Sequence, residues 1–351
     1  MAEGWRVFVH GGVIVPTDPG PAAAFLRTSK PGAYTTTRTL DGGSSLLLWE
    51  RHMARLSESL QLLHTAHPHM YPHLGNAVQV KGLVEPSVEE SLSKALNLRR
   101  PEEEVNLSIL VCGSNSRHSQ LGSCDCDVYV LASSYRAPGK DEILPAIRVA
   151  VMGPGRKLAR AKDSLWASTR QGLESVKPSG TNEVILSNNG NALLEGLVTN
   201  FFIVKIRDEK IQEQGESQRR TEGGDNEHNL SDYEVLTAPL SDGVLNGVIR
   251  NVLIEVCREA GIAIREISPS WSAHHMWKEA FVTNALRILQ PVKSIQMPAS
   301  WPHELDPENF RETEWQICNL EMCGMVTKQI HDLVMDRIRQ LSTPVINFAR
   351  K

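Results

Sequence analysis

The sequence has no long hydrophobic run. No apolar segment in its 351 residues approaches the roughly eighteen to twenty residues that a membrane-spanning helix needs. Its first stretch, MAEGWRVFVHGGVIV, does not place a basic segment before an apolar one, and it is not the Arg- and Ser-rich leader of an organelle import signal. We therefore expect a cytoplasmic protein with no membrane partner.

Cysteine is also scarce, with six residues that lack the spacing of a disulfide framework. Cys124-Asp-Cys126 is not accompanied by the paired C-x-x-C knuckles of a structural zinc site. The His-rich segment HTAHPHMYPH, residues 64–73, contains two prolines, which interrupt a helix, and we interpret it as a polar surface loop. We expect reduced thiols and no metal.

Neither sign of charge is in clear excess. The chain has 37 Lys and Arg against 41 Asp and Glu, a net charge of −4, which argues against a nucleic-acid binder held by bulk electrostatics. Its length is too great for one small core and suits two domains. The composition favours small-molecule chemistry.

A polar segment, RAPGKDE, has the composition of an interdomain linker. Before it, strand-like runs flank the helical period of LLLWERHMARLSESLQLL, in which Leu56, Leu60 and Leu63 share one stripe. The predicted division is a small N-terminal α+β domain, a linker and a large C-terminal domain, at residues 1–135, 136–142 and 143–351.

The second half contains a polar segment, about residues 207–234, that is almost free of large apolar side chains, and we predict a mobile insertion there. The segment VLTAPLSDGVLNGVIRNVLIEVCREAGI then predicts a strand, a turn and an amphipathic helix that begins near Asn246 and Gly247.

Residues 182–204, NEVILSNNGNALLEGLVTNFFIV, predict a hairpin, because aliphatic and β-branched runs flank the turn signal Asn189-Gly190. Glu195 lies in the second run, which is too apolar for an exposed edge. A buried carboxylate needs a partner, so we expect Glu195 to face a cation.

Lys162 follows a strand-like run, opens a predicted helix after a basic segment, and stands 33 residues before Glu195. A lysine and a buried carboxylate in one pocket suit pyridoxal 5'-phosphate (PLP), since the lysine forms a Schiff base with the cofactor and the carboxylate keeps the pyridine nitrogen protonated. Lys157, 38 residues before Glu195, is the alternative lysine.

The cofactor's phosphate would need donors at a helix start. The segment NGVIR offers Gly247 for close approach and the backbone amides of Val248 and Ile249. The turn TNAL could add a second set of donors, and Arg55 a fixed positive charge. The residues of that turn are Thr283, Asn284 and Ala285.

The order of motifs GAYTTTRTLDGGSSLLLWERHMARL, AKDSLWASTRQGLE, NEVILSNNGNALLEGLVTNFFIV, LTAPLSDGVLNGVIR and EAFVTNALRILQPV resembles the class IV, or fold-type IV, aminotransferases of the PLP-dependent enzymes. That family includes branched-chain and D-amino-acid aminotransferases and 4-amino-4-deoxychorismate lyase. The most specific match is the family pattern E-G-x-x-x-N-x-F, which here is Glu195, Gly196, Asn200 and Phe202.

The resemblance implies a two-domain fold with a small α+β domain and a larger, mixed β-barrel-like domain surrounded by helices, and it implies a homodimer. It assigns Lys162 as the Schiff-base lysine, Glu195 as the partner of the pyridine nitrogen and Arg55 as a phosphate ligand. Tyr34 and Arg38 match the strand that faces the substrate. The phosphate turns are Gly247, Val248 and Ile249 together with Thr283, Asn284 and Ala285.

Two departures from the family pattern bear on the reaction. Ile249 stands where many members have a threonine, and the tyrosine that several members carry after the lysine is replaced by the stretch Leu165-Trp166-Ala167. Three functions stay open: an aminotransferase acting on an amino acid and a 2-oxo acid, a lyase that releases pyruvate and 4-aminobenzoate from aminodeoxychorismate, and a catalytically silent binding module. Retention of Lys162 and Glu195 disfavours the third, and the breadth of the family favours the first.

Overall fold

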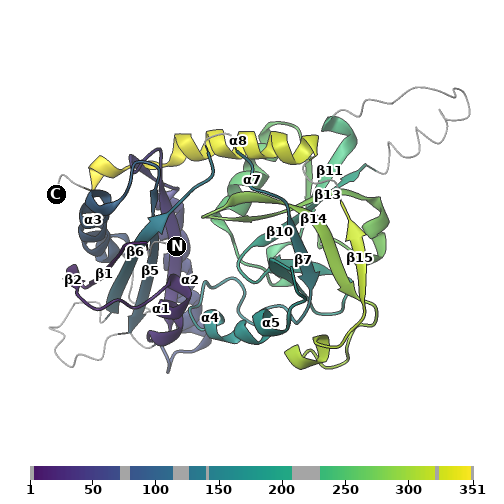
Figure 1. Cartoon of the computed structure of the whole chain (residues 1–351), viewed down its shortest axis with the longest axis horizontal. Coiled ribbons are helices and arrows are strands. Elements are labelled where there is room, and N and C mark those ends of the chain that lie inside the picture. The colour runs from purple at the N-terminus through teal and green to yellow at the C-terminus, as the bar shows by residue number, and fades with distance from the viewer. Residues whose placement is uncertain are drawn as a thin grey trace, which may run out of the picture. The chain divides into compact units, whose positions relative to one another are not determined.

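A computed structural model describes residues 4–71, 80–113, 126–139, 142–207, 230–320 and 324–348. The chain (Figure 1) forms two compact units: residues 1–139, 158–171 and 338–351 make the first, and residues 140–157 and 172–337 make the second. Within the described part, no helix has both the length and the apolar character needed to cross a bilayer.

The first unit is built on a seven-stranded antiparallel sheet of order β16-β4-β3-β5-β6-β1-β2. Its core is closed by α2 and α3, and the predicted stripe of Leu56, Leu60 and Leu63 on α2 is buried in it. The elements of this unit are β1 (Arg6–His10), β2 (Val13–Val15), α1 (Ala22–Thr28), β3 (Gly32–Leu40), β4 (Ser45–Leu46), α2 (Trp49–Ala66), α3 (Val80–Leu98), β5 (Glu104–Gly113), β6 (Cys126–Tyr135), α4 (Trp166–Thr169) and β16 (Thr343–Pro344).

Six strands of the second unit close a ring in the order β10-β13-β14-β7-β8-β9, because β9 pairs back onto β10 through Glu195 and Asn200. Two further strands, β11 and β12, extend the sheet from β10, and β15 pairs with β14. The elements are β7 (Ile147–Val151), α5 (Gln171–Val176), β8 (Glu183–Ser187), β9 (Leu193–Gly196), β10 (Asn200–Ile206), β11 (Tyr233–Thr237), α7 (Val248–Glu259), β12 (Ala263–Glu266), β13 (Trp277–Asn284), β14 (Ile288–Pro298), β15 (Trp315–Asn319) and α8 (Met325–Leu341), which extends into the first unit's last segment. The predicted barrel-like domain is confirmed.

The predicted hairpin is confirmed as the antiparallel pair β8 and β9. In its turn the Asn189 side chain accepts hydrogen bonds from the N–H groups of Asn191 and Ala192, and Gly190 has a φ of +71°, which glycine adopts without strain. The second run is not one strand. It breaks after Gly196 and resumes as β10, which places Glu195 directly across from Asn200.

The two units differ from the predicted domains in two segments. Residues 158–171 and 338–351, which the linker position assigned to the large domain, belong to the first unit. The physical reason is backbone pairing, since Asp163 forms a bridge with Ala33 of β3, and Thr343 of β16 pairs with Leu46 of β4. Such pairing between distant segments leaves no mark in local composition.

The His-rich segment is only partly a loop. Helix α2 continues through Ala66, because its first proline is Pro68, and the His64 ring nitrogen Nδ1 lies 2.9 Å from the Tyr71 carbonyl oxygen. His73 lies outside the described residues, as do residues 208–229 of the predicted insertion. The insertion's end, Leu230–Asp232, is a short 3-10 helix that leads into β11.

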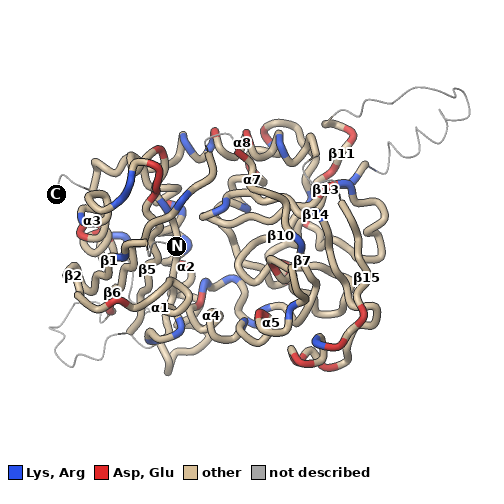
Figure 2. The backbone as a smooth tube through the Cα atoms, in the orientation of Figure 1, with Lys and Arg blue, Asp and Glu red and all other residues tan. Residues whose placement is uncertain are grey.

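Charged residues of both signs are interspersed along both units (Figure 2), as the balanced composition predicts. Among the residues that the structure describes, Cys112, Cys257 and Cys318 are free thiols.

Candidate functional site

Lys162 lies in a short extended segment that is hydrogen-bonded to the edge of β3. The Tyr34 N–H donates to the Lys162 carbonyl oxygen, and the Ser164 N–H donates to the Gly32 carbonyl oxygen, both at 2.9 Å. The Lys162 N–H donates to Ser59 Oγ of α2 at 3.1 Å. Bonds from two elements therefore fix the backbone on both sides of the lysine side chain.

The Lys162 side chain is half-buried, and its Nζ lies 4.5 Å from the centroid of the Tyr34 ring, within the range of a cation–π interaction. Helix α4 begins only at Trp166, so Lys162 precedes the helix by a turn rather than opening it. Lys157, the alternative lysine, is exposed and belongs to the second unit.

Arg55 is buried on the face of α2 that packs against β3. Its Nη2 donates to Thr35 Oγ1 at 2.9 Å, and Thr35 Oγ1 lies 2.7 Å from His52 Nδ1. Arg55 Nη2 also lies 3.4 Å from His52 Nδ1, and because a guanidinium can only donate, we assign Nδ1 as an acceptor and the ring proton to Nε2. The sequence pattern indicated Arg55 but neither Thr35 nor His52, although the spacing of His52 and Arg55 puts them on one face of a helix.

His52 is completely buried, and burial, followed by the charges of Arg55 and Lys162, lowers its pKa well below the usual value of 6.5. The imidazole is therefore neutral at neutral pH. Its Nε2 has no hydrogen-bond partner among the residues that the structure describes.

Tyr34 and Arg38 lie on the opposite face of β3 from Thr35, as the two-residue period of a strand requires. Tyr34 contacts Lys162, as described above. Arg38 donates from Nη1 to the Thr39 carbonyl oxygen at 3.2 Å and lies over the Tyr135 ring at 5.6 Å. Burial lowers its pKa below the ordinary value of an arginine, while Tyr135 and nearby carboxylates oppose that shift.

In the second unit, Glu195 is 2% exposed at the end of β9. Its carboxylate forms an ion pair with Arg156, with Nε and Nη2 at 2.8 and 2.7 Å from Oε1, and Oε2 accepts the Leu245 N–H at 2.9 Å. Glu195 therefore contacts a cation within this unit, but that cation is Arg156, which the sequence pattern did not single out, and the predicted contact with a pyridine nitrogen stays a prediction. The basic segment RKLARAK, which contains Arg156, was the available signal.

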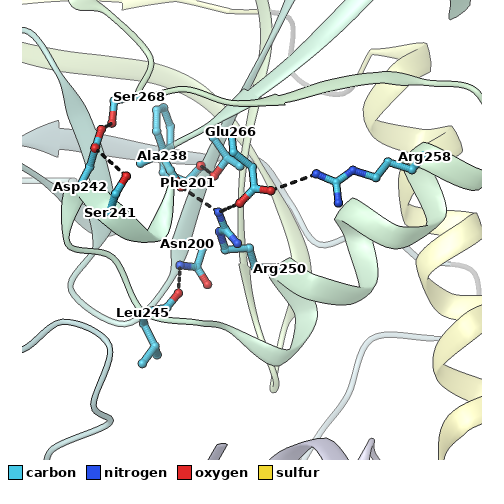
Figure 3. Close-up of polar contacts among 11 residues, drawn as sticks. Asn200, Phe201, Ala238, Ser241, Asp242, Leu245, Arg250, Arg258, Glu266 and Ser268 are labelled. Atoms are coloured by element: carbon cyan, nitrogen blue, oxygen red, sulfur yellow. Dashed lines mark hydrogen bonds and ion pairs between the residues drawn. The ribbon is translucent and has the colours of Figure 1, made fainter. Parts of the chain in front are cut away.

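The loop before α7 is hydrogen-bonded to β9 and β10 of the ring. The Asn200 side chain donates to the Leu245 carbonyl oxygen at 2.9 Å (Figure 3). The N–H of the same leucine donates to Glu195, the residue that pairs with Asn200. At Gly247 a Cβ would lie 2.0 Å from Asn200 Oδ1, so any larger residue would force the Asn200 side chain or the helix start to shift. Its φ of −68° is ordinary, which means that space rather than backbone strain requires the glycine.

Helix α7 begins at Val248, as predicted, and Gly247 provides no side-chain cap. The first amides of a helix have no intrahelical acceptor, so those of Val248 and Ile249 form a ready anion-binding terminus. Arg250 holds this terminus in place, with Nη2 donating to the Ala238 carbonyl oxygen at 2.9 Å and to Glu266 at 2.8 Å (Figure 3).

Thr283 pairs with Asn200 across β13 and β10 and is 2% exposed. Its hydroxyl is fully buried without a hydrogen-bond partner among the described residues. An orphaned hydroxyl and an uncapped helix terminus fit a phosphate group, which accepts hydrogen bonds from both.

The other two residues of the predicted turn have different environments. The Asn284 side chain accepts from the N–H groups of Leu286 and Arg287, at 3.1 and 2.8 Å, so it stabilises the turn between β13 and β14. Ala285 is half-buried beside it. The turn closes at Ile288, whose φ of +62° is strained for a β-branched residue.

Comparison with known proteins identifies the class. A family model described as amino-transferase class IV matches residues 32–295, so the chain belongs to the class IV aminotransferase family. None of the curated proteins matches the chain. The protein is a PLP-dependent enzyme with the fold-type IV fold.

Solved structures share this fold at low sequence identity. A branched-chain aminotransferase from Thermoproteus uzoniensis with norvaline is 17% identical with a TM-score of 0.58, covering 97% of this chain and 99% of its own. The PLP form of a branched-chain amino acid aminotransferase from Thermobaculum terrenum is 16% identical with a TM-score of 0.62, covering 97% and 98%. The branched-chain amino acid aminotransferase from Escherichia coli is 17% identical with a TM-score of 0.56, covering 93% and 92%.

Proposed function

We propose that this protein transfers an amino group between an amino acid and a 2-oxo acid, and that Lys162 forms the Schiff base with PLP. The observation that carries the proposal is the environment of Lys162, whose backbone is bonded to β3 and α2 while its amine lies against Tyr34. Bound PLP supplies an electron sink for the electrons left at the substrate's α carbon.

The residues of this chain take separate roles in the proposal. Lys162 supplies the amine that binds the cofactor and then moves a proton at the substrate's α carbon. Glu195 holds the pyridine nitrogen protonated. The phosphate is bound by the amides of Val248 and Ile249, by the Thr283 hydroxyl, and by Arg55. Tyr34 and Arg38 are the proposed substrate-facing residues, and the proposed assembly is a cytoplasmic homodimer.

Borohydride trapping tests the proposed lysine. Purified protein should be yellow, and reduction should attach the cofactor permanently to the peptide that contains Lys162. Lys162→Ala should abolish the visible band and turnover, whereas Lys157→Ala, the matched control at an exposed lysine, should keep both. An adduct on Lys157 would refute the assignment.

A lyase is the second candidate, and one local feature favours it. Exposed Leu165, followed by Trp166, occupies the neighbourhood in which several family members carry a tyrosine, and this makes the segment more similar to the lyase branch. Product analysis separates the two reactions: a 2-oxo acid formed from an amino acid, with transfer to a second 2-oxo acid, supports the aminotransferase. Pyruvate and 4-aminobenzoate formed from aminodeoxychorismate would support the lyase.

A further inference from the structure

Glu195 and Arg156 form a buried ion pair in the second unit. Two nitrogens of one guanidinium approach a single carboxylate oxygen, and the side chains of Arg156 and Glu195 are 9% and 3% exposed. Arginine stays charged in proteins, so this pair keeps a fixed positive charge beside the carboxylate. Removing one partner of such a pair leaves the other charge buried without compensation.

The pair is continuous with the loop that forms the start of α7. The carboxylate oxygen that does not contact Arg156 accepts the Leu245 N–H, and the Leu245 carbonyl oxygen accepts from Asn200. Glu195 is therefore held from two directions, by a side chain that precedes the lysine segment and by the backbone that precedes Gly247. A carboxylate fixed in this way has little freedom to change its rotamer.

We propose that Arg156 is a positioning residue for the cofactor: it fixes the Glu195 carboxylate toward the pyridine nitrogen of PLP and moderates, by its charge, how strongly that carboxylate holds the nitrogen's proton. The inference rests on the proposed function, because it concerns the same site. The ion pair would then act on the cofactor as well as on the stability of the fold. An arginine that served folding alone would leave the cofactor's protonation unchanged.

Placement and charge have separable consequences. Arg156→Lys keeps the positive charge but loses the two-pronged contact of the guanidinium. Arg156→Met keeps much of the side-chain length and loses the charge. With a positive charge removed, protons on the bound cofactor are released less readily, so the midpoint pH of its visible band should rise by about one unit.

The test compares these two variants with wild type and with Lys157→Met, which removes a positive charge from the adjacent, exposed residue. Three quantities are measured: the midpoint pH of the visible band, the affinity for added PLP, and the thermal unfolding of the cofactor-free protein. We expect Arg156→Met to raise the midpoint and to lower turnover about thirty- to a hundred-fold, by analogy with the loss of one charged hydrogen-bond partner. Arg156→Lys should keep the midpoint and lose turnover to a smaller extent, and Lys157→Met should match wild type.

A double variant adds an independent criterion. If Arg156 acts through Glu195, then Arg156→Met combined with Glu195→Gln should turn over no more slowly than Glu195→Gln alone. Additive losses would overturn the proposal, and so would an unchanged midpoint in Arg156→Met with only its unfolding temperature lowered. If Arg156→Met fails to fold, the proposal is judged on Arg156→Lys, where wild-type turnover would overturn it. A wild-type protein that gives no visible band with PLP would overturn the proposed function itself, and the inference with it.

Discussion

In the first unit, a buried chain of polar contacts joins Arg55, Thr35 and His52. Lys162, Glu195 and Arg55 stood out because their types and order match a known pattern. Thr35 and His52 did not, since a buried hydroxyl and a neutral imidazole gain their meaning only from the 2.9 and 2.7 Å contacts that link them to Arg55. Side-chain contacts across β3 and α2 depend on packing, which local sequence does not specify.

The buried imidazole of His52 makes stability depend on pH. Because the pKa of His52 in the folded protein lies well below 6.5, the unfolded chain binds the extra proton first as the pH falls. Protonation of His52 in the unfolded chain therefore leaves the free energy of unfolding unchanged above about pH 6.5 and lowers it progressively below that value, until the pH reaches the pKa of His52 in the folded protein. His52→Asn, which retains an acceptor for Thr35 but cannot titrate, should flatten this part of the curve.

The measurement is the free energy of unfolding from urea titrations between pH 5 and pH 8, for wild type and His52→Asn. His64→Asn is the control, since His64 is half-buried near the end of α2. An equal slope below pH 6.5 in wild type and His52→Asn would show that other groups set the acid sensitivity.

Helices and strands were predicted well where their signal comes from residues that are close together in the sequence. The stripe of α2 and the hairpin of β8 and β9 follow from side chains near in sequence. The break between β9 and β10 was not foreseen, because the apolar run continues through it and only the closure of the ring separates the two strands. Closure depends on partners more than a hundred residues apart along the chain, such as β7 and β14.

At the start of α7, Gly247 lies close to the Asn200 side chain. Gly247→Ala would place a Cβ at 2.0 Å from Asn200 Oδ1, so either the Asn200 side chain or the helix terminus must move. Overpacking of this kind costs about 1 to 3 kcal/mol, and displacement of the amides of Val248 and Ile249 should weaken PLP binding as well.

A cofactor titration and a thermal melt of Gly247→Ala check both effects. Gly82→Ala is the matched control, because Gly82 lies within α3 and an added Cβ there meets nothing within 4 Å. That change should stabilise the protein by about 0.5 to 1 kcal/mol, as alanine does in a helix, and leave PLP affinity unaltered. Wild-type affinity in Gly247→Ala would mean that the terminus does not bind the phosphate.

At the scale of the whole chain, two segments distant in sequence complete the first unit. Residues 158–171 bring Lys162 to β3. The chain's last part adds β16 to β4, and it packs the Phe348 ring against Trp49 in a T-shaped arrangement with the ring centroids 5.5 Å apart. A single linker was predicted from composition because a domain boundary in sequence is visible only where a polar segment marks it. Return crossings of a folded chain carry no such mark.

Ending the chain after Ser342 tests the contribution of its last part. The truncated protein loses β16 and the buried side chains of Val345 and Phe348, and burial of aliphatic and aromatic groups stabilises by roughly 1.5 to 3 kcal/mol per side chain. We expect a melting temperature lower by several degrees. Phe348→Ala should give part of this decrease and Ile346→Ala, at an exposed residue, almost none. Equal melting of the truncated and complete proteins would contradict the assignment of this segment to the first unit.

The threading of the chain through the two units limits how its gene could be recombined. The chain passes from one unit to the other at residues 139/140, 157/158, 171/172 and 337/338. A crossover at the first of these joints would exchange the N-terminal sheet between two homologues. Lys162 would then come from one parent, and the β3 residues to which its backbone is hydrogen-bonded would come from the other. Viable chimaeras should therefore preserve parental matching between residues 32–34 and 162–164, whatever happens to the linker, and shuffled libraries should show this pair inherited together.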